Sequence, residues 1–260
     1  MNRTIMATIL IGLDDTDNAD SRGTGRLGRT LLAELVRRGV APGGGQPCSL
    51  SVTRHQLLVD PRIPYTSHNS AACVAVASDD GTEAAGFVFD FVAERAAAGS
   101  DPGVCLAGVE AVAPAVRQFG RRAAVEVVQM SEAMALAADL GLELRGLGGS
   151  GLGVIGALAA VGLRAGGNDG RFIDLVGLQG AAGLRELADR VGAADLAGLG
   201  IRVEHRSRRE PRGDDEYDTL GWVRPRLLGG RAVLPVAWNE ERNAWVPIDR
   251  KRTQRRRPAE

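Results

Sequence analysis

The fold is decided by residues 9–17, which read ILIGLDDTD. A short apolar run ends there in the carboxylates of Asp14, Asp15 and Asp17. An apolar run of this length that stops at a turn predicts a buried strand. In open α/β sheets, ligands gather at the carboxyl ends of the strands. We therefore expect residues 14–17, called the acid turn below, to lie at the functional end of a central strand.

Carboxylates this close in the chain repel one another unless a cation or a shared proton relieves them. Mg²⁺ suits such a cluster, because it binds to one or two carboxylates together with the phosphates of a substrate. Asp14, Asp15 and Asp17 are therefore the predicted metal ligands and catalytic residues. The alternative is a structural turn in which Asp17 or Asn18 caps the next helix, since Asp and Asn suit both roles.

Two glycine loops are predicted to bind phosphate. The first follows the acid turn and leads into a helical pattern at 27–36, and the second stands between an expected strand at 142–147 and an apolar helix at 154–163. Glycine amides, a helix N-terminus and arginine side chains all favour an anion. The predicted phosphate ligands are Arg22, Gly23, Thr24 and Arg26 in the first loop, and Gly148, Gly149, Ser150, Gly151 and Gly153 in the second.

We expect the helices that follow these two loops to begin at one shared crevice. The first loop also has a plainer interpretation, a flexible connection that only caps its helix. The second loop lacks the lysine and the hydroxyl residue of a GxxxxGK[ST] motif. Lysine occurs in this chain only at Lys251, so a lysine-based mechanism is disfavoured and phosphate binding falls to arginine.

Two polar turns are predicted to face a second substrate. One contains His68 and Asn69, and the other contains Asn168 and Asp169. Loops carry binding and catalytic residues more often than the elements that they connect. A histidine can act as a base or donate to a phosphate, although a loop histidine that only bonds solvent is the alternative for His68.

The rest of the chain alternates helical and strand patterns, which predicts an α/β fold with a mixed α+β sheet. Helices are expected at 81–99, 111–119, 131–140 with Ser131 as the cap, and 181–191; strands are expected at 48–58, 71–77, 104–107, 124–129, 172–176, 217–223, 232–238 and 243–247. Three parts are predicted: a nucleotide- and metal-binding domain at 1–198, a smaller part at 199–249 and a disordered basic tail at 250–260.

The composition is that of a globular protein without a strong charge field. Lys and Arg number 32, as do Asp and Glu, so the net charge of zero does not favour nucleic acid as a partner. Three cysteines without a CxxC pair indicate a reducing cytoplasm and no zinc site. No signal peptide or membrane-spanning run is present in the sequence, so no membrane partner is expected.

Taken together and in order, these motifs resemble the archaeal isoleucine-tRNA agmatinylcytidine synthetase family. The matching stretches are IGLDDTD at 11–17, DPRIPY at 60–65 and GVIGALAAVG at 153–162. In that family, an N-terminal kinase-like domain uses ATP to phosphorylate the C2 carbonyl oxygen of a cytidine, and agmatine then displaces the phosphate. A ferredoxin-like domain follows, and then an OB-fold and a zinc ribbon that engage tRNA.

The resemblance implies a kinase-like domain with a small ferredoxin-like or β-rich part attached, and ATP and Mg²⁺ as cofactors. It marks Asp14, Asp15 and Asp17 as metal-binding and catalytic, and the loop at 148–153 as part of a phosphate site. No OB-fold or CxxC zinc ribbon is expected in this chain.

Two local departures from the family pattern affect the prediction. The family's phosphorylatable threonine is expected just after Gly23, where we match Gly25 and Arg26, with Thr24 displaced from that place. We therefore expect Arg26 to grip a γ-phosphate. The family's Arg-Gly-Asn stretch is replaced by residues 68–70, His-Asn-Ser.

The sequence thus predicts a cytoplasmic phosphoryl-transfer enzyme that uses Mg²⁺ and ATP on an unidentified acceptor. One alternative is a nucleotide-binding regulatory module without turnover. Another is a tRNA cytidine-modifying enzyme that ligates agmatine or a similar amine through other RNA contacts. RNA is not the favoured partner, and a homodimer is left open.

Overall fold

The computed structural model describes residues 7–39, 48–63, 69–78, 81–177 and 183–248. Its first six elements follow the order βαββαβ: β1 (Ala7–Asp14), α1 (Thr24–Arg37), β2 (Ser51–Gln56), β3 (Ser70–Ser78), α2 (Gly81–Arg95) and β4 (Gly103–Gly108). The four strands lie in the order β4-β1-β3-β2, and every neighbouring pair is antiparallel. This is the arrangement of a ferredoxin-like unit. It places β1 in the interior of the sheet.

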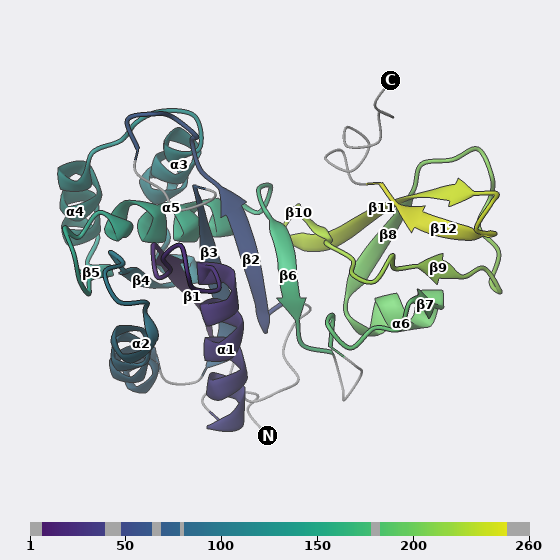
Figure 1. Ribbon diagram of the computed structural model, residues 1–260, viewed down its shortest axis with the longest axis horizontal. Helices are drawn as coiled ribbons and strands as arrows, with labels where there is room; N and C mark the ends of the chain where they lie inside the picture. The colour runs from purple at the N-terminus through teal and green to yellow at the C-terminus, as the bar shows by residue number, and fades with distance from the viewer. Residues whose placement is uncertain (1–6, 40–47, 64–68, 79–80, 178–182, 249–260) are drawn as a thin grey trace.

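Further elements extend this unit. They are the 3₁₀ helix η1 (Val109–Ala111), α3 (Pro114–Ala123), α4 (Met130–Asp139), β5 (Glu143–Gly146), α5 (Gly153–Gly166) and β6 (Arg171–Leu175). β5 pairs with β4 and β6 pairs with β2, so the helical lobe of Figure 1 contains the sheet order β5-β4-β1-β3-β2-β6. None of the described helices is long and apolar enough to cross a membrane.

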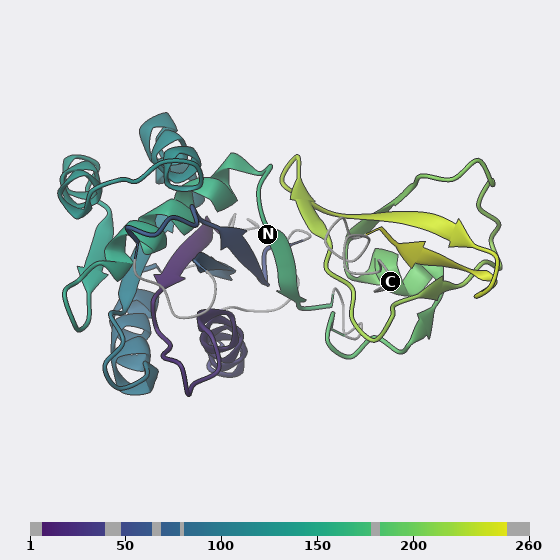
Figure 2. The ribbon, with the colours of Figure 1, turned by 45° about the horizontal axis from the view of Figure 1, so that its top comes forward.

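Helices cover both faces of this sheet (Figure 2). α1 and α2 pack on one face, where Ile9, Ile11 and Leu13 of β1 are buried. α3, α4 and α5 cover the other, where Leu10 is buried. Successive side chains of a strand point to opposite faces, and a strand covered on both faces needs apolar residues throughout. That requirement explains the unbroken apolar run before Asp14.

The C-terminal lobe is β-rich. It contains β7 (Arg190–Val191), α6 (Ala193–Gly198), β8 (Ile201–His205), β9 (Tyr217–Asp218), β10 (Arg226–Leu228), β11 (Arg231–Asn239) and β12 (Ala244–Pro247). β6 pairs with both β2 and β10, so it joins the two lobes. The pairs β8 with β11 and β9 with β12 are parallel, which makes the sheet mixed.

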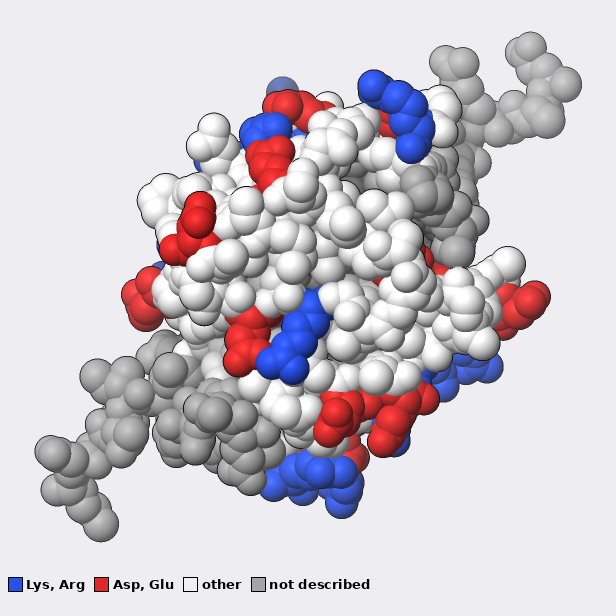
Figure 3. Space-filling view, turned by 90° about the vertical axis from the view of Figure 1, so that its left-hand side faces the viewer, with Lys and Arg blue, Asp and Glu red and all other residues white. Residues whose placement is uncertain are grey.

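The surface charge of the helical lobe is balanced where it can be seen. In Figure 3, which views the molecule from that end, acidic and basic side chains lie in small groups of both signs among uncharged residues. No continuous basic area covers the described part of this face.

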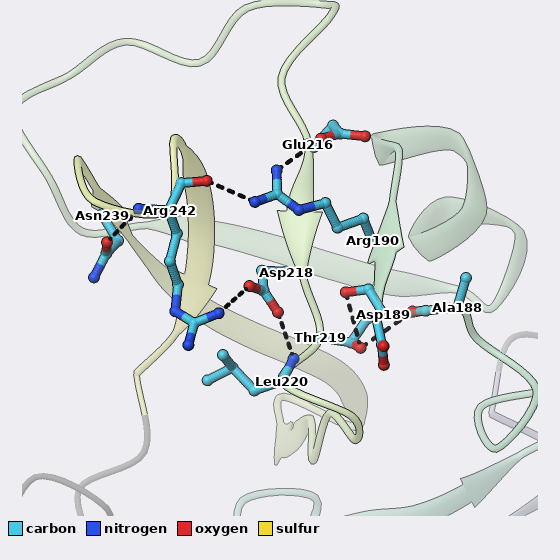
Figure 4. Close-up of polar contacts among 9 residues, drawn as sticks. All are labelled: Ala188, Asp189, Arg190, Glu216, Asp218, Thr219, Leu220, Asn239 and Arg242. Atoms are coloured by element: carbon cyan, nitrogen blue, oxygen red, sulfur yellow. Dashed lines mark hydrogen bonds and ion pairs between the residues drawn. The ribbon is translucent and has the colours of Figure 1, made fainter.

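A polar network holds the end of the C-terminal lobe together (Figure 4). The nearly buried Asp218 accepts from the amide of Leu220 at 2.8 Å and from Arg242 at 2.6 Å. Although burial raises the pKa of Asp218, these two hydrogen bonds hold the pKa below its usual value. Arg190 donates to Glu216 and to the carbonyl of Arg242, which links β7 to the turn before β12. Because each of these groups has a partner, the network is structural.

The predicted fold class is confirmed: the protein is a mixed α/β structure with a β-rich C-terminal lobe. The ferredoxin-like order occurs at the N-terminus instead of in that lobe. The third core cluster contains residues on both sides of position 198, including Leu196 and Ile201, so the predicted domain boundary stays a prediction. The tail at 250–260 lies outside the described residues.

Several predicted elements are wrong. Residues 124–129 form a turn and an extended segment after α3 instead of a strand, and Val125 is 70% exposed. The described residues of the helix expected at 181–191 form turns and then β7. The strand expected at 217–223 stops at Asp218, because Leu220 and Gly221 have positive φ values of 54° and 78°.

The start of α4 and two further elements also differ from the prediction. α4 begins at Met130, and its N-cap, Gln129, makes no side-chain cap, so Ser131 does not cap the helix. α6 and β8 were not predicted. Both are short and depend on packing within the C-terminal lobe, where Leu196 and Ile201 are buried.

Glycine permits an unusually close approach between α5 and β1. A Cβ atom on Gly12 of β1 would overlap the carbonyl oxygen of Ala157 in α5. A Cβ on Gly156 would overlap the carboxylate of Asp14. The backbone of the helix therefore rests directly on the strand, and its first turn covers the side chain of Asp14.

Gly156→Ala should destabilise the protein or displace Asp14, because the added methyl group has no room. Overpacking of a tight core costs about 1–3 kcal/mol and sometimes more, so we expect a loss of at least about 2 kcal/mol in a denaturant titration. Gly166→Ala is the matched control. It lies in the last turn of the same helix, and its Cβ would meet nothing within 4 Å. Equal stability of the two variants would contradict this account of α5 packing.

Candidate functional site

The acid turn begins where β1 ends at Asp14. Asp15 has a positive φ of 48° and so turns the chain sharply. Asp and Asn tolerate this conformation better than most residues. The carbonyl of Asp15 accepts from the amide of Asp101 at 3.1 Å, and the carbonyl of Thr16 accepts from Ala97 at 3.0 Å. The loop between α2 and β4 therefore holds the turn in place.

Two carboxylates of this region, those of Asp14 and Asp15, have raised pKa values. Burial against α5, followed by the charge of Asp15, raises the pKa of Asp14 to about 7. Burial, followed by the charges of Asp101 and Asp17, raises the pKa of Asp15 to about 6. Four carboxylates thus meet at this end of the sheet, and all but Asp101 were predicted from the sequence. A cation here would relieve their repulsion.

Thr24 links the acid turn to the start of α1. Its hydroxyl donates to Oδ1 of Asp17 at 2.8 Å, and its amide donates to the same oxygen at 3.1 Å. The hydroxyl and amide of Thr16 also contact Thr24 Oγ1, at 3.2 and 3.3 Å. Asp17 therefore accepts from the first amide of α1, whereas the N-cap residue itself is Gly23 and makes no side-chain cap. The same geometry is within the reach of a general base for the hydroxyl that it would deprotonate.

A pocket of about 290 Å³ opens beside this pair. The predicted residues Asp17, Arg22, Gly23, Thr24 and Arg26 all line it. The other described lining residues come from α1, β2, β3, β6 and the C-terminal lobe. They are Gly25, Arg29, Arg54, Ser70, Ala71, Ala72, Ile173, Arg185 and Trp222. The pocket thus combines one acidic side chain with five arginines.

The second glycine loop lies against Asp101, at the same end of the sheet as the acid turn. Its amides already have an acceptor: Asp101 receives the N–H groups of Gly151 at 2.6 Å and Leu152 at 3.2 Å, and the hydroxyl of Ser150 at 2.5 Å. Residues 148–153 do not line the pocket. The loop's role in phosphate binding therefore stays a prediction. The pocket at the start of α1 includes no residue from the start of α5, so the shared crevice expected for both helix starts stays a prediction.

Of the two polar turns, the structure describes Asn69, Asn168 and Asp169, and none of these three lines the pocket. His68 lies outside the described residues. Asn69 donates to the carbonyl of Leu58 at 2.6 Å and so closes the connection between β2 and β3. Asn168 accepts from the amide of Gly229 at 2.8 Å. Asp169 lies 3.1 Å from Nδ1 of the fully buried His55.

These contacts give Asn168 and Asp169 structural partners. The turn that holds them follows the C-terminal end of α5, whereas the acid turn meets its first turn. A 14-residue helix is about 21 Å long at the usual rise of 1.5 Å per residue. The predicted contact of this turn with a second substrate stays a prediction.

The donor set suits a magnesium ion that phosphates help to hold. Among the described residues, no group of three or more His, Cys, Asp or Glu side chains is arranged to bind a metal alone. Mg²⁺ needs only one or two carboxylates when substrate phosphates complete its coordination. Asp15 and Asp17 fit that requirement, since Asp17 lines the pocket and its charge raises the pKa of Asp15.

Four contributors to this region were missed by sequence reasoning. Asp101 had a weak signal, because it stands in a turn directly before the buried strand β4. Arg54 lies within a strand pattern that indicates core packing. Arg185 and Trp222 are distant in sequence from the other lining residues, and only the tertiary structure brings them to the pocket.

Comparison with known proteins gives a partial match. No family model matches the chain. The chain is 35% identical over 158 residues to TiaS of Pyrococcus horikoshii, the 2-agmatinylcytidine synthetase of an isoleucine tRNA, covering 58% of this chain and 35% of TiaS. The protein resembles TiaS over this part of its length. It spans about a third of the length of that relative.

TiaS structures are also found among solved proteins. A complex of TiaS with its isoleucine tRNA and ATP matches with 28% identity and a TM-score of 0.49, covering 60% of this chain and 36% of that one. A complex of TiaS with the same tRNA, AMPCPP and agmatine matches with 27% identity and a TM-score of 0.47, again covering 60% and 36%. A tRNA fluorescent labeling enzyme matches with 29% identity and a TM-score of 0.49 over the same shares.

Asp15→Asn should stabilise the protein at alkaline pH when no divalent cation is present. The folded-state pKa of about 6 lies above the ordinary 3.8, so ionisation of Asp15 costs the folded state stability as the pH rises through this window. Asparagine carries no charge and tolerates the positive φ. We expect a higher Tm at pH 8, by about 2–4 °C for each kcal/mol of repulsion relieved, and a gain that shrinks towards pH 4.

Differential scanning calorimetry of the two proteins across this range measures the effect. Asp20→Asn is the control, because Asp20 is an exposed carboxylate in the same loop. A stabilisation by Asp15→Asn that is the same at pH 4 and pH 8 would show that charge repulsion is not its cause.

Proposed function

We propose that this protein is a Mg²⁺- and ATP-dependent phosphoryl-transfer enzyme that activates an acceptor for ligation. The observation that carries the proposal is the Thr24 hydroxyl, which donates to Asp17 at 2.8 Å in an arginine-lined pocket. Phosphoryl transfer needs positioning and neutralised charge more than covalent assistance. A carboxylate, a hydroxyl and several fixed cations meet that need.

The nucleotide phosphates bind at the start of α1 in this proposal. This 14-residue helix presents the positive end of its dipole to the pocket. Arg22 and Arg26 line the same pocket. Asp15 and Asp17 would hold Mg²⁺ together with the phosphates, and the ion would supply charge neutralisation for the transfer. The sequence match to TiaS, a protein that has been solved with ATP bound, supports the nucleotide.

Thr24 is the proposed first acceptor of the phosphoryl group. Asp17 takes the hydroxyl proton while Thr24 Oγ1 forms its bond to the γ-phosphorus, and the bond from that phosphorus to the bridging oxygen of ADP breaks. In the sequence, Thr24 was set aside as displaced, and its place was assigned to Arg26. Contact between Thr24 and Asp17 now favours the threonine, with Arg26 as a phosphate ligand beside it.

A second candidate function is modification of a tRNA cytidine. It is favoured by the TiaS relative, whose name specifies synthesis of 2-agmatinylcytidine in an isoleucine tRNA. In this candidate, the activated group is the base of a cytidine and the incoming nucleophile is agmatine or a similar amine. Agmatine- and ATP-dependent mass gain of a tRNA transcript distinguishes it from transfer to a small acceptor.

Incubation with Mg-ATP should place phosphate on Thr24. Mass spectrometry of the peptide that covers residues 18–29 measures the product directly, and a longer peptide that reaches residue 37 includes Thr30. We expect no phosphate in Thr24→Ala, and a rate lowered about 10²–10⁴-fold in Asp17→Asn, which is the usual contribution of a general base. Thr30→Ala is the control, because its hydroxyl donates to the carbonyl of Arg26 within the same helix. Transfer that continues at the normal rate without Asp17 removes the proposed base.

Arg26→Ala should weaken ATP more than ADP, because the guanidinium is proposed to meet the γ-phosphate. Charge-assisted hydrogen bonds of this kind contribute about 1.5–3 kcal/mol, and calorimetric titration of both nucleotides measures the difference. Arg37→Ala is the matched control, since Arg37 lies in the last turn of the same helix and pairs with Glu34. Equal losses for ATP and ADP would assign Arg26 to another part of the nucleotide.

A further inference from the structure

Three arginines on the wall of the pocket share one feature of geometry. Each is anchored through its Nε atom: Arg29 to Asp174 at 3.0 Å, Arg54 to the hydroxyl of Ser70 at 2.8 Å, and Arg185 to the carbonyl of Ile173 at 2.9 Å. Anchoring at Nε fixes the plane of a guanidinium and leaves its two terminal nitrogens for a ligand. Paired terminal nitrogens match two oxygens of a phosphate.

The C-terminal lobe holds Arg185 still further. The guanidinium of Arg185 lies 3.6 Å from the ring centroid of Trp222, and that of Arg224 lies 3.8 Å from it. Two groups this close cannot share one face of the ring, so Trp222 is sandwiched between them. The indole Nε1 is buried and has no hydrogen-bond partner among the described residues. Trp222 and Arg185 thus form a rigid wall that carries an unused donor.

Positive charge exceeds negative charge among the side chains that line the pocket, which include five arginines and one aspartate. Burial, followed by the charge of Arg29, lowers the pKa of Arg185. The charge of Asp174 raises this pKa, and the charge of Arg224 lowers it. Burial also lowers the pKa of Arg54. Cations held this close together cost the folded protein stability until an anion joins them. The arrangement therefore favours a ligand that carries negative charge.

We propose that Arg29, Arg54 and Arg185 form a subsite for a phosphate group on the second substrate. The proposal rests on the proposed function, in which the nucleotide phosphates occupy the start of α1 with Arg22 and Arg26. The three anchored arginines lie on α1, β2 and the segment after β6, so they come from both lobes. The acceptor is therefore a phosphate ester, and its phosphate positions it against the wall while its reacting group faces Thr24.

Calorimetric titration of inorganic phosphate into the protein saturated with a non-hydrolysable Mg-ATP analogue tests the subsite. We expect the wild-type protein to bind phosphate with the analogue in place. Arg185→Gln and Arg54→Gln should each weaken this binding at least about tenfold, which corresponds to 1.4 kcal/mol. The phosphate affinity of Arg185→Lys should lie between those of the wild-type protein and Arg185→Gln, because lysine keeps the charge but loses the planar pair of donors and the stacking on Trp222. Arg121→Gln is the control, because Arg121 is exposed on α3, away from the pocket.

Two outcomes would overturn the subsite. One is displacement of phosphate by the nucleotide analogue, which would show a single shared site. The other is unchanged phosphate affinity in folded Arg185→Gln and Arg54→Gln, with folding checked by thermal melting. If the analogue fails to bind but phosphate binding depends on Arg185 and Arg54, the proposed function fails and the anion site stands.

Competition identifies the source of the phosphate. A sugar monophosphate offers a terminal phosphate, and a dinucleoside monophosphate offers an internal one. If only the sugar monophosphate competes, the acceptor is a small phosphorylated molecule. If the dinucleoside monophosphate competes, the acceptor is a polynucleotide strand. If neither displaces inorganic phosphate, the assignment of the subsite to the second substrate is wrong.

Discussion

The structure depends on the direct contact between the backbone of α5 and β1. Gly12 and Gly156 remove the side chains that would otherwise separate the helix from the strand. Interiors are packed so closely that even one added methyl group is felt. The contact brings the first turn of α5 over Asp14 and buries that carboxylate, which is why its pKa rises to about 7. Packing of the core thus sets the electrostatics of the acid turn.

Thr24 contacts one cluster of like charge and lines the pocket that holds the other. The acid turn and Asp101 gather carboxylates that raise the pKa of Asp15. The pocket wall gathers arginines, of which Arg185 has a lowered pKa. Each cluster is costly alone, and the two kinds of ligand in the proposed reaction, a divalent cation and phosphates, would relieve both costs. Strain of this kind is common at functional sites, where stability is exchanged for preorganised charge.

The carboxylate of Asp101 shows how an apparent ligand site can be satisfied internally. A glycine loop before a helix has the amides and dipole that an anion prefers. In this protein, those amides donate to the carboxylate of Asp101, and the amide of Asp101 donates to the carbonyl of Asp15. Through Asp101, the glycine loop therefore helps to hold the acid turn in place. Sequence spacing cannot reveal this use, because Asp101 is 50 residues away from Gly151.

The sequence by itself determined the elements that local pattern controls. The apolar run of β1, the leucine period of α1 and the small-residue helix α5 were all predicted, because burial on both faces or on one stripe leaves a periodic trace. It also identified Asp17, Arg22, Thr24 and Arg26, which one loop places together. Only the tertiary structure decided the rest. Residues 124–129 have a strand-like composition but pair with none of the described strands, and residues 183–191 of the expected helix form turns and β7. Arg54, Arg185 and Trp222 reach the pocket through pairing of β6 with β2 and β10, and hydrogen bonds between distant strands leave no signal in local sequence.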